Sequence, residues 1–115
     1  MSLELQVHYG QTPVVLVLSG DLDIRTCSQF RDCLTNLISQ GNQFVMIDLE
    51  QVGFVDSAGL GVLVGCLKRL RGIDGDLSLR FSQRNLTRLL EITGLMPVFR
   101  VEPAIGRGIS DRSNL

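Results

Sequence analysis

The sequence predicts a single α/β domain with a mixed, mostly parallel sheet of about five strands and three to four helices. Strand-like apolar segments alternate with segments of helical periodicity along most of the chain. The first two strand-like segments are separated by one short turn, which favours an antiparallel hairpin at one edge of the sheet. The chain has 115 residues, 44% of them hydrophobic and 20% charged, which fits one globular domain with its own core.

The chain opens with two predicted strands. Apolar and polar side chains alternate over residues 3–8, the period of a half-buried strand. Residues 10–13 contain glycine and proline and are typical of a turn. Residues 14–18 form a continuous apolar run, which predicts a strand covered on both faces.

A helix and a second buried strand follow. We expect Thr26 to be the N-cap of this helix, with Gln29 completing a capping box. Residues 30–38 have apolar side chains at helical spacing, and Gly41 is predicted to end the helix. Residues 44–49 are strongly apolar and predict the next strand.

A second helix is predicted from about Ser57, because residues 58–70 are apolar over most of their circumference. Basic side chains gather at residues 68–71, where they interact favourably with the carboxyl end of the helix dipole, and Gly72 follows as the stop. This helix therefore has clear signals at both ends.

The last elements are a strand, a helix and a short strand. Residues 77–81 alternate like a strand, and Ser82 is the expected cap of a third helix that Gly94 ends. Residues 97–101 allow a final short strand. We predict one domain over residues 1–105 and a flexible tail over residues 106–115, which have two glycines and no apolar run.

Composition excludes several classes of function. A net charge of -1, one tyrosine and no tryptophan argue against direct nucleic-acid binding, which usually needs a basic excess or aromatic stacking. Cys27, Cys33 and Cys66 have no CxxC spacing and fit reduced thiols better than a metal site or a disulfide. No signal peptide and no membrane-length apolar run are visible, so we expect a cytoplasmic protein without a membrane partner.

The most informative segment is residues 52–61, between a buried strand and an apolar helix. It places Ser57 at or beside a helix N-terminus, where backbone N–H groups lack partners within the helix. The hydroxyl is either a plain N-cap, worth about 1 kcal/mol, or a phosphorylation site, because a helix N-terminus tolerates negative charge. Gly59 and Gly61 are unfavourable in a helix and suggest close approach of a neighbouring element or of a partner.

These residues resemble the signature of STAS domains. The matching positions are Asp48-Leu49, Val52 and residues 54–61, supported by residues 18–23 and by Gly94-Leu95. The likeness extends over roughly residues 3 to 101 and is strongest to the small anti-anti-sigma factors of bacteria, also called anti-sigma factor antagonists.

The resemblance implies a regulatory partner switch without enzymatic activity and without a cofactor. Ser57 would be the phospho-acceptor, and Ala58 stands where many relatives have a second hydroxyl residue. The unphosphorylated form would bind an anti-sigma factor that is also a serine protein kinase, and a sigma factor would be released. Phosphorylation would break the complex, and a PP2C-type phosphatase would restore it.

The surface that would bind this partner surrounds Ser57. We expect it to include Asp21, Asp23, Thr26, Asp56, Ser57, Ala58, Gly59, Leu60 and Gly61. Asp23 and Asp56 are expected to make this end of the domain acidic, so an added phosphate would repel an acidic patch on the partner.

Two alternative functions remain, of which the second has little support in the sequence. A STAS module in a partner-switching pathway without a sigma factor would use the same serine. A serine hydrolase would need a glycine at Val55 for a nucleophile elbow, and its base would have to be His8, the only histidine, on the first strand.

Overall fold

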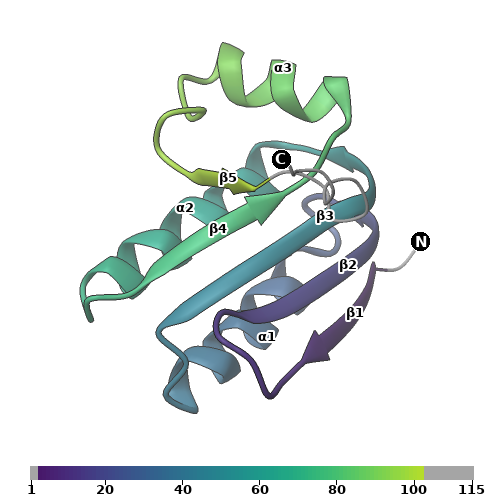
Figure 1. Ribbon diagram of the computed structural model, residues 1–115. Coiled ribbons are helices and arrows are strands. Elements are labelled where there is room, and N and C mark those ends of the chain that lie inside the picture. The colour runs from purple at the N-terminus through teal and green to yellow at the C-terminus, as the bar shows by residue number, and fades with distance from the viewer. Residues whose placement is uncertain (1–2, 103–115) are drawn as a thin grey trace, which may run out of the picture.

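The computed structural model describes residues 3–102, which form five strands and three helices in the predicted α/β order (Figure 1). The elements are β1 (Leu3–His8), β2 (Val14–Leu22), α1 (Cys27–Ser39), β3 (Phe44–Val55), α2 (Ser57–Arg71), β4 (Asp76–Arg80), α3 (Arg84–Ile92) and β5 (Arg100–Glu102). The tail predicted over residues 106–115 lies outside the described residues.

The strands form one sheet in the order β1-β2-β3-β4-β5. β1 and β2 pair antiparallel, with Leu5 opposite Leu18, which confirms the predicted hairpin. The other three pairings are parallel. Because each parallel strand lies beside the preceding one, right-handed crossovers bring α1, α2 and α3 to the same face of the sheet.

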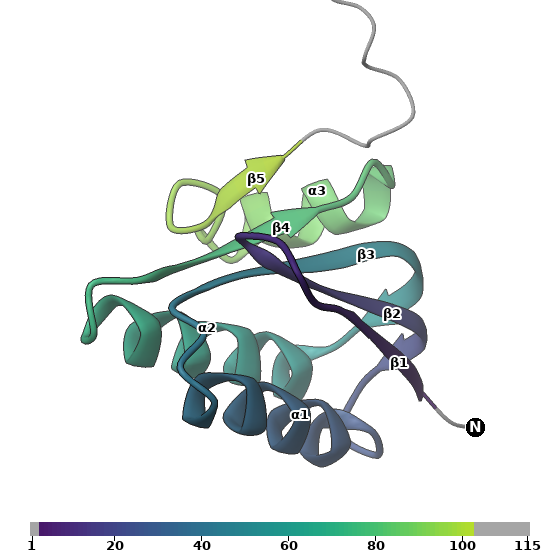
Figure 2. The same cartoon turned by 60° about the horizontal axis from the view of Figure 1, so that its bottom comes forward.

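The core lies between the sheet and these helices. On β2 the side chains of Val14, Leu16 and Leu18 are buried on the helix side, where α1 and α2 lie next to each other (Figure 2). Leu86 and Leu90 of α3 close the core beside α2. Within residues 3–102, no helix is long and apolar enough to cross a membrane.

Two strands are longer than predicted, and this extension builds the site. β2 continues to Leu22 and β3 to Val55, where these two residues pair. The polar and glycine-containing ends of both strands remain in the sheet because parallel pairing satisfies their backbone groups. The last strand is Arg100–Glu102, shifted from the predicted residues 97–101.

Thr26 is the N-cap residue of α1, as predicted, but the predicted capping box is wrong. The Thr26 hydroxyl makes no capping bond to the helix. Instead it accepts the N–H of Asp23 at 3.0 Å and donates to the carbonyl of Asp21 at 2.7 Å. Gln29 donates from Nε2 to the carbonyl of Leu3 at 2.8 Å. Both side chains therefore form hydrogen bonds with other segments, the end of β2 and the start of β1, instead of capping the helix.

The predicted cap of α3 is also wrong. Gln83 occupies the N-cap position, and the Ser82 hydroxyl bonds the Glu50 carboxylate at 2.9 Å. The Gln83 amide donates to the carbonyls of Leu49 at 2.7 Å and Val52 at 2.8 Å. Contacts to β3 determine the hydrogen-bond partners of both side chains. A local sequence pattern does not contain such contacts.

Candidate functional site at the start of helix α2

Ser57 is the first residue of α2 and follows β3 at the carboxyl end of the parallel strands. Its side chain is exposed. The helix is capped by Asp56 and not by Ser57: Asp56 Oδ1 accepts the N–H groups of Ala58 at 2.9 Å and Gly59 at 3.1 Å. Since the neighbouring carboxylate fills the capping role, the Ser57 hydroxyl is open to solvent and to another protein.

Asp56 also ties α2 to the loop between β2 and α1. Its Oδ2 accepts the N–H of Ile24 at 3.0 Å, and its own N–H donates to the carbonyl of Leu22 at 3.2 Å. A Cβ on Gly59 would lie 2.7 Å from both Cγ and the carbonyl oxygen of Leu22. Gly59 is therefore explained by close packing within the domain, one of the two alternatives left open above.

Asp23 lies in the same loop but is buried, with only 5% of its surface exposed. Its Oδ2 pairs with the Arg25 guanidinium at 3.0 Å, and its Oδ1 accepts the N–H of Arg25 at 2.9 Å. The hydrogen bond from the Arg25 side chain holds the pKa of Asp23 below its ordinary value. The expectation that Asp23 makes this end acidic is therefore wrong, because its carboxylate is buried and paired with the exposed guanidinium of Arg25.

The remaining predicted residues differ in how far a partner could reach them. Thr26, Gly59 and Leu60 are buried, so they shape the surface from beneath. Ser57 and Gly61 are exposed on α2. The other three, Asp21, Asp56 and Ala58, are half-buried.

Two apolar side chains beside the site were not among the predicted residues. Ile24 is 71% exposed and Phe54 is 51% exposed. Ile24 is held next to α2 by its bond to Asp56, and Phe54 pairs with Asp21 at the end of β3. Phe54 lies two positions after the buried Val52, but the register with β2 shifts between them and leaves Gly53 without a partner, so simple strand alternation does not predict its exposure. Exposed apolar side chains around an exposed hydroxyl are typical of a protein-binding surface.

His8 is far from this site. It pairs with Val15 near the start of β2, whereas Ser57 follows the end of β3. A general base must lie within hydrogen-bond reach of the group that it deprotonates. The geometry therefore gives the serine hydrolase hypothesis no support.

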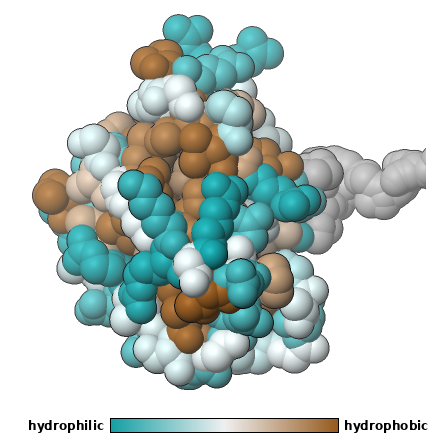
Figure 3. Space-filling model, turned by 90° about the vertical axis from the view of Figure 1, so that its left-hand side faces the viewer, coloured by the Kyte–Doolittle hydropathy of each residue, from teal (hydrophilic) through white to brown (hydrophobic). Residues whose placement is uncertain are grey.

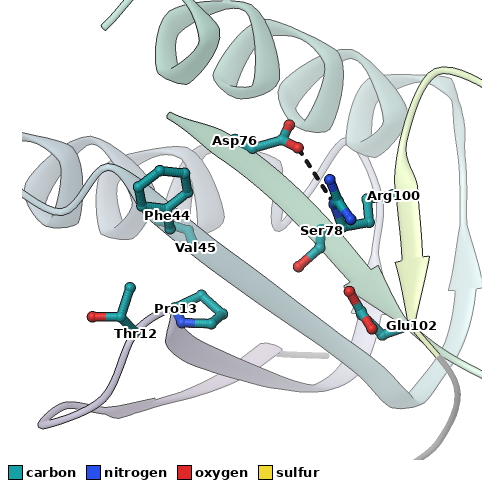
Figure 4. A pocket seen from close by; sticks show the side chains of 8 residues that line it. All are labelled: Thr12, Pro13, Phe44, Val45, Asp76, Ser78, Arg100 and Glu102. Atoms are coloured by element: carbon teal, nitrogen blue, oxygen red, sulfur yellow. Dashed lines mark ion pairs between the residues drawn. The ribbon is translucent and has the colours of Figure 1, made fainter. Parts of the chain in front are cut away.

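The opposite end of the sheet has a hollow of about 390 Å³ where the parallel strands begin (Figure 4). Asp76 and Arg100, which line it, pair with each other at 3.7 Å. Figure 3 shows this end of the molecule, where apolar patches are separated by hydrophilic side chains. Phe44 and Ile73 are each 43% exposed here, less than Ile24 and Phe54.

Comparison with known proteins bears on the family and the fold of this chain. The model of the STAS domain family matches residues 2–107. The anti-sigma-B factor antagonist of Staphylococcus aureus is 36% identical over 101 residues, which are 88% of this chain and 94% of that protein. Its namesake in Bacillus subtilis is 29% identical over 109 residues, 95% of this chain and 99% of the relative.

Solved structures share the fold. The Bacillus cell fate determinant SpoIIAA in its phosphorylated form superposes with a TM-score of 0.71 at 25% identity, covering 90% of this chain and 93% of its own.

Proposed function

This chain belongs to the STAS domain family, and we propose that it is an anti-sigma factor antagonist whose binding is controlled by phosphorylation of Ser57. The observation on which the proposal depends is the exposed side chain of Ser57, which follows the carboxylate that binds the exposed Ile24 and lies three residues after the exposed Phe54. Two relatives are named as anti-sigma-B factor antagonists, and a structural relative is known in a phosphorylated form. The protein would act in the cytoplasm as a regulator, without catalysis of its own.

In the unphosphorylated state, the surface around Ser57 binds an anti-sigma factor that also has serine kinase activity. This binding releases the sigma factor. The kinase then transfers the γ-phosphoryl group of ATP to Ser57 Oγ: the new O–P bond forms, the bond to ADP breaks, and the hydroxyl proton passes to a base of the kinase. A phosphatase of the PP2C type hydrolyses the phosphoserine and restores the binding form.

The physical basis of the switch is the charge added at Ser57. A phosphate brings about -1.5 to -2 charges and a tightly held hydration shell. Burying that group against a partner, beside the apolar Ile24 and Phe54, would cost several kcal/mol in affinity. The same charge sits at a helix N-terminus, which favours anions, so the fold itself should remain intact.

Binding and phosphorylation can be tested together. The anti-sigma factor from the same genome would be purified and titrated calorimetrically with wild type, Ser57→Ala and Ser57→Asp. We expect wild type and Ser57→Ala to bind and Ser57→Asp to bind far more weakly. Ser39→Asp places the same charge on an exposed serine at the carboxyl end of α1 and should leave binding unchanged.

Mass spectrometry after incubation with ATP and the anti-sigma factor would locate the phosphate. Modification at a residue other than Ser57, or equal affinity of wild type and Ser57→Asp, would contradict the proposal. If the chain binds a signalling protein unrelated to sigma factors, with the same dependence on Ser57, the alternative of a different partner-switching pathway is correct.

A further inference from the structure

A groove of about 390 Å³ runs between α1 and α2 and begins beside Ser57. Its α2 side is made of small residues at helical spacing, Ala58, Gly61 and Gly65. A Cβ built on Gly61 or Gly65 would meet nothing within 4 Å, so the two glycines do not serve close packing inside the domain. Gly59, two positions before Gly61, does serve such packing. The glycines on this face therefore leave space open on the outside of the molecule.

The groove is apolar along its base and basic at its rim. Cys27 and Cys66 line it, and burial raises the pKa of the Cys66 thiol, which therefore stays uncharged. Arg31 on α1 and Arg69 on α2 are both exposed and line the two sides. Arg69 bonds the Thr35 hydroxyl at 3.3 Å, a neutral group.

These two arginines form no ion pair, unlike four other arginines of residues 3–102. Arg25, Arg71, Arg80 and Arg100 each form an ion pair with an aspartate. No ion pair within residues 3–102 involves Arg31 or Arg69, and none of the residues that line the groove is acidic. The groove thus offers two guanidinium groups without an ion-pair partner, one carried by each helix, and the Arg69 guanidinium reaches across to Thr35 on α1.

We propose that this groove is a second part of the docking surface and receives an acidic amphipathic helix of the anti-sigma factor. The helix would place apolar side chains over Gly61 and Gly65 and carboxylates against Arg31 and Arg69, as in other helix-in-groove complexes. The proposal rests on the function proposed above, because Ala58 and Ile24 belong both to the groove and to the surroundings of Ser57.

Charge favours this occupant over a second copy of the chain. A symmetric dimer through the groove would bring Arg31 and Arg69 of both copies together, and like charges at an interface oppose association. An acidic partner segment instead satisfies both arginines. Such a segment would also extend the contact from Ser57 along α2.

The test uses the purified anti-sigma factor and the full-length chain. The double variant Arg31→Glu/Arg69→Glu should weaken binding by about tenfold or more, as expected for the reversal of close interfacial charges. Gly65→Leu, which fills the groove, should also weaken binding by about tenfold or more. The matched control Arg84→Glu/Arg88→Glu makes the same charge change on exposed residues of α3 and should bind as wild type does.

Urea unfolding of each variant establishes that it is folded, and Arg31→Lys/Arg69→Lys should keep most of the affinity. If wild type binds, Ser57→Asp does not, and both groove variants bind as wild type, the groove proposal is wrong while the proposed function stands. If wild type and Ser57→Ala both fail to bind, the proposed function fails, and this proposal with it. Equal loss in the α3 control, or a change in self-association instead of partner binding, would also overturn it.

Discussion

The Asp56 carboxylate accepts the backbone N–H of Ile24 at 3.0 Å and so joins two loops that are 32 positions apart in the sequence. Its other oxygen caps α2 through the N–H groups of Ala58 and Gly59. One side chain therefore positions both an exposed apolar residue and the helix that begins with Ser57. The site is assembled around Asp56 and not around the serine itself.

Removal of this carboxylate should weaken the fold. We expect Asp56→Ala to lower the free energy of unfolding by about 1–2 kcal/mol, because α2 loses its cap and Ile24 loses its partner. Asp56→Asn keeps an acceptor oxygen and should lose less. Urea denaturation measures both, with Asp32→Ala, an exposed aspartate of α1, as the control. Equal stability of Asp56→Ala and wild type would show that the junction does not depend on this residue.

Two glycines of α2 should respond in opposite directions to the same substitution. Gly59→Ala would place a methyl group 2.7 Å from Leu22, and we expect a loss of about 1–3 kcal/mol. Gly61→Ala meets nothing within 4 Å and should stabilise the protein by up to about 1 kcal/mol, since alanine is the better helix former. Chemical denaturation of both variants measures the two free energies of unfolding. The expectation fails if Gly61→Ala is the more destabilising change.

The ion pair of Asp23 and Arg25 should make stability depend on pH in the acidic range. The pKa of Asp23 is lowered in the folded state, chiefly by the hydrogen bond from the Arg25 side chain. A lowered pKa means that the contribution is complete above about pH 5 and is lost as the pH falls through the folded-state pKa. Arg25→Gln should therefore lower the melting temperature most near neutral pH, and the difference from wild type should shrink towards pH 3.

A carboxyl NMR titration gives the direct readout of this effect. Asp23 should titrate at a higher pH in Arg25→Gln than in wild type. Arg71→Gln, which removes the pairing of Arg71 with Asp76, should leave the Asp23 titration unchanged. An unchanged Asp23 titration in Arg25→Gln would refute the assignment.

The exposed apolar residues beside Ser57 should matter for binding and not for stability. Ile24→Ser and Phe54→Ser should each change the free energy of unfolding by no more than about 0.5–1 kcal/mol. Each should weaken binding of the anti-sigma factor by about tenfold, as expected for apolar contacts near the centre of an interface. Ile92→Ser, on α3 and 75% exposed, is the matched control for calorimetric titration. If all three variants bind alike, the apolar pair is not part of the interface.

The order of elements could be predicted because hydrophobic periodicity is a local property. Residues 3–8 and 14–18 alternate or run apolar in the way that their strands require, and both strands are present. The ends of two helices could also be predicted from glycines: Gly41 and Gly94 follow α1 and α3 with φ of 96° and 75°. Few residues other than glycine adopt this conformation, so a glycine that follows a run of helical periodicity indicates the helix end.

Ser57 was found from its sequence context, since the run around it is compact and contiguous. What the sequence determined by itself was therefore the α/β order, the helix stops and the serine at the start of α2. Only the tertiary structure decided which side chains cap the helices, that Asp23 is buried and paired with Arg25, and that Ile24 and Phe54 are exposed. The physical reason is that hydroxyl, amide and carboxylate groups bind the nearest available partner, and folding brings partners from distant parts of the chain.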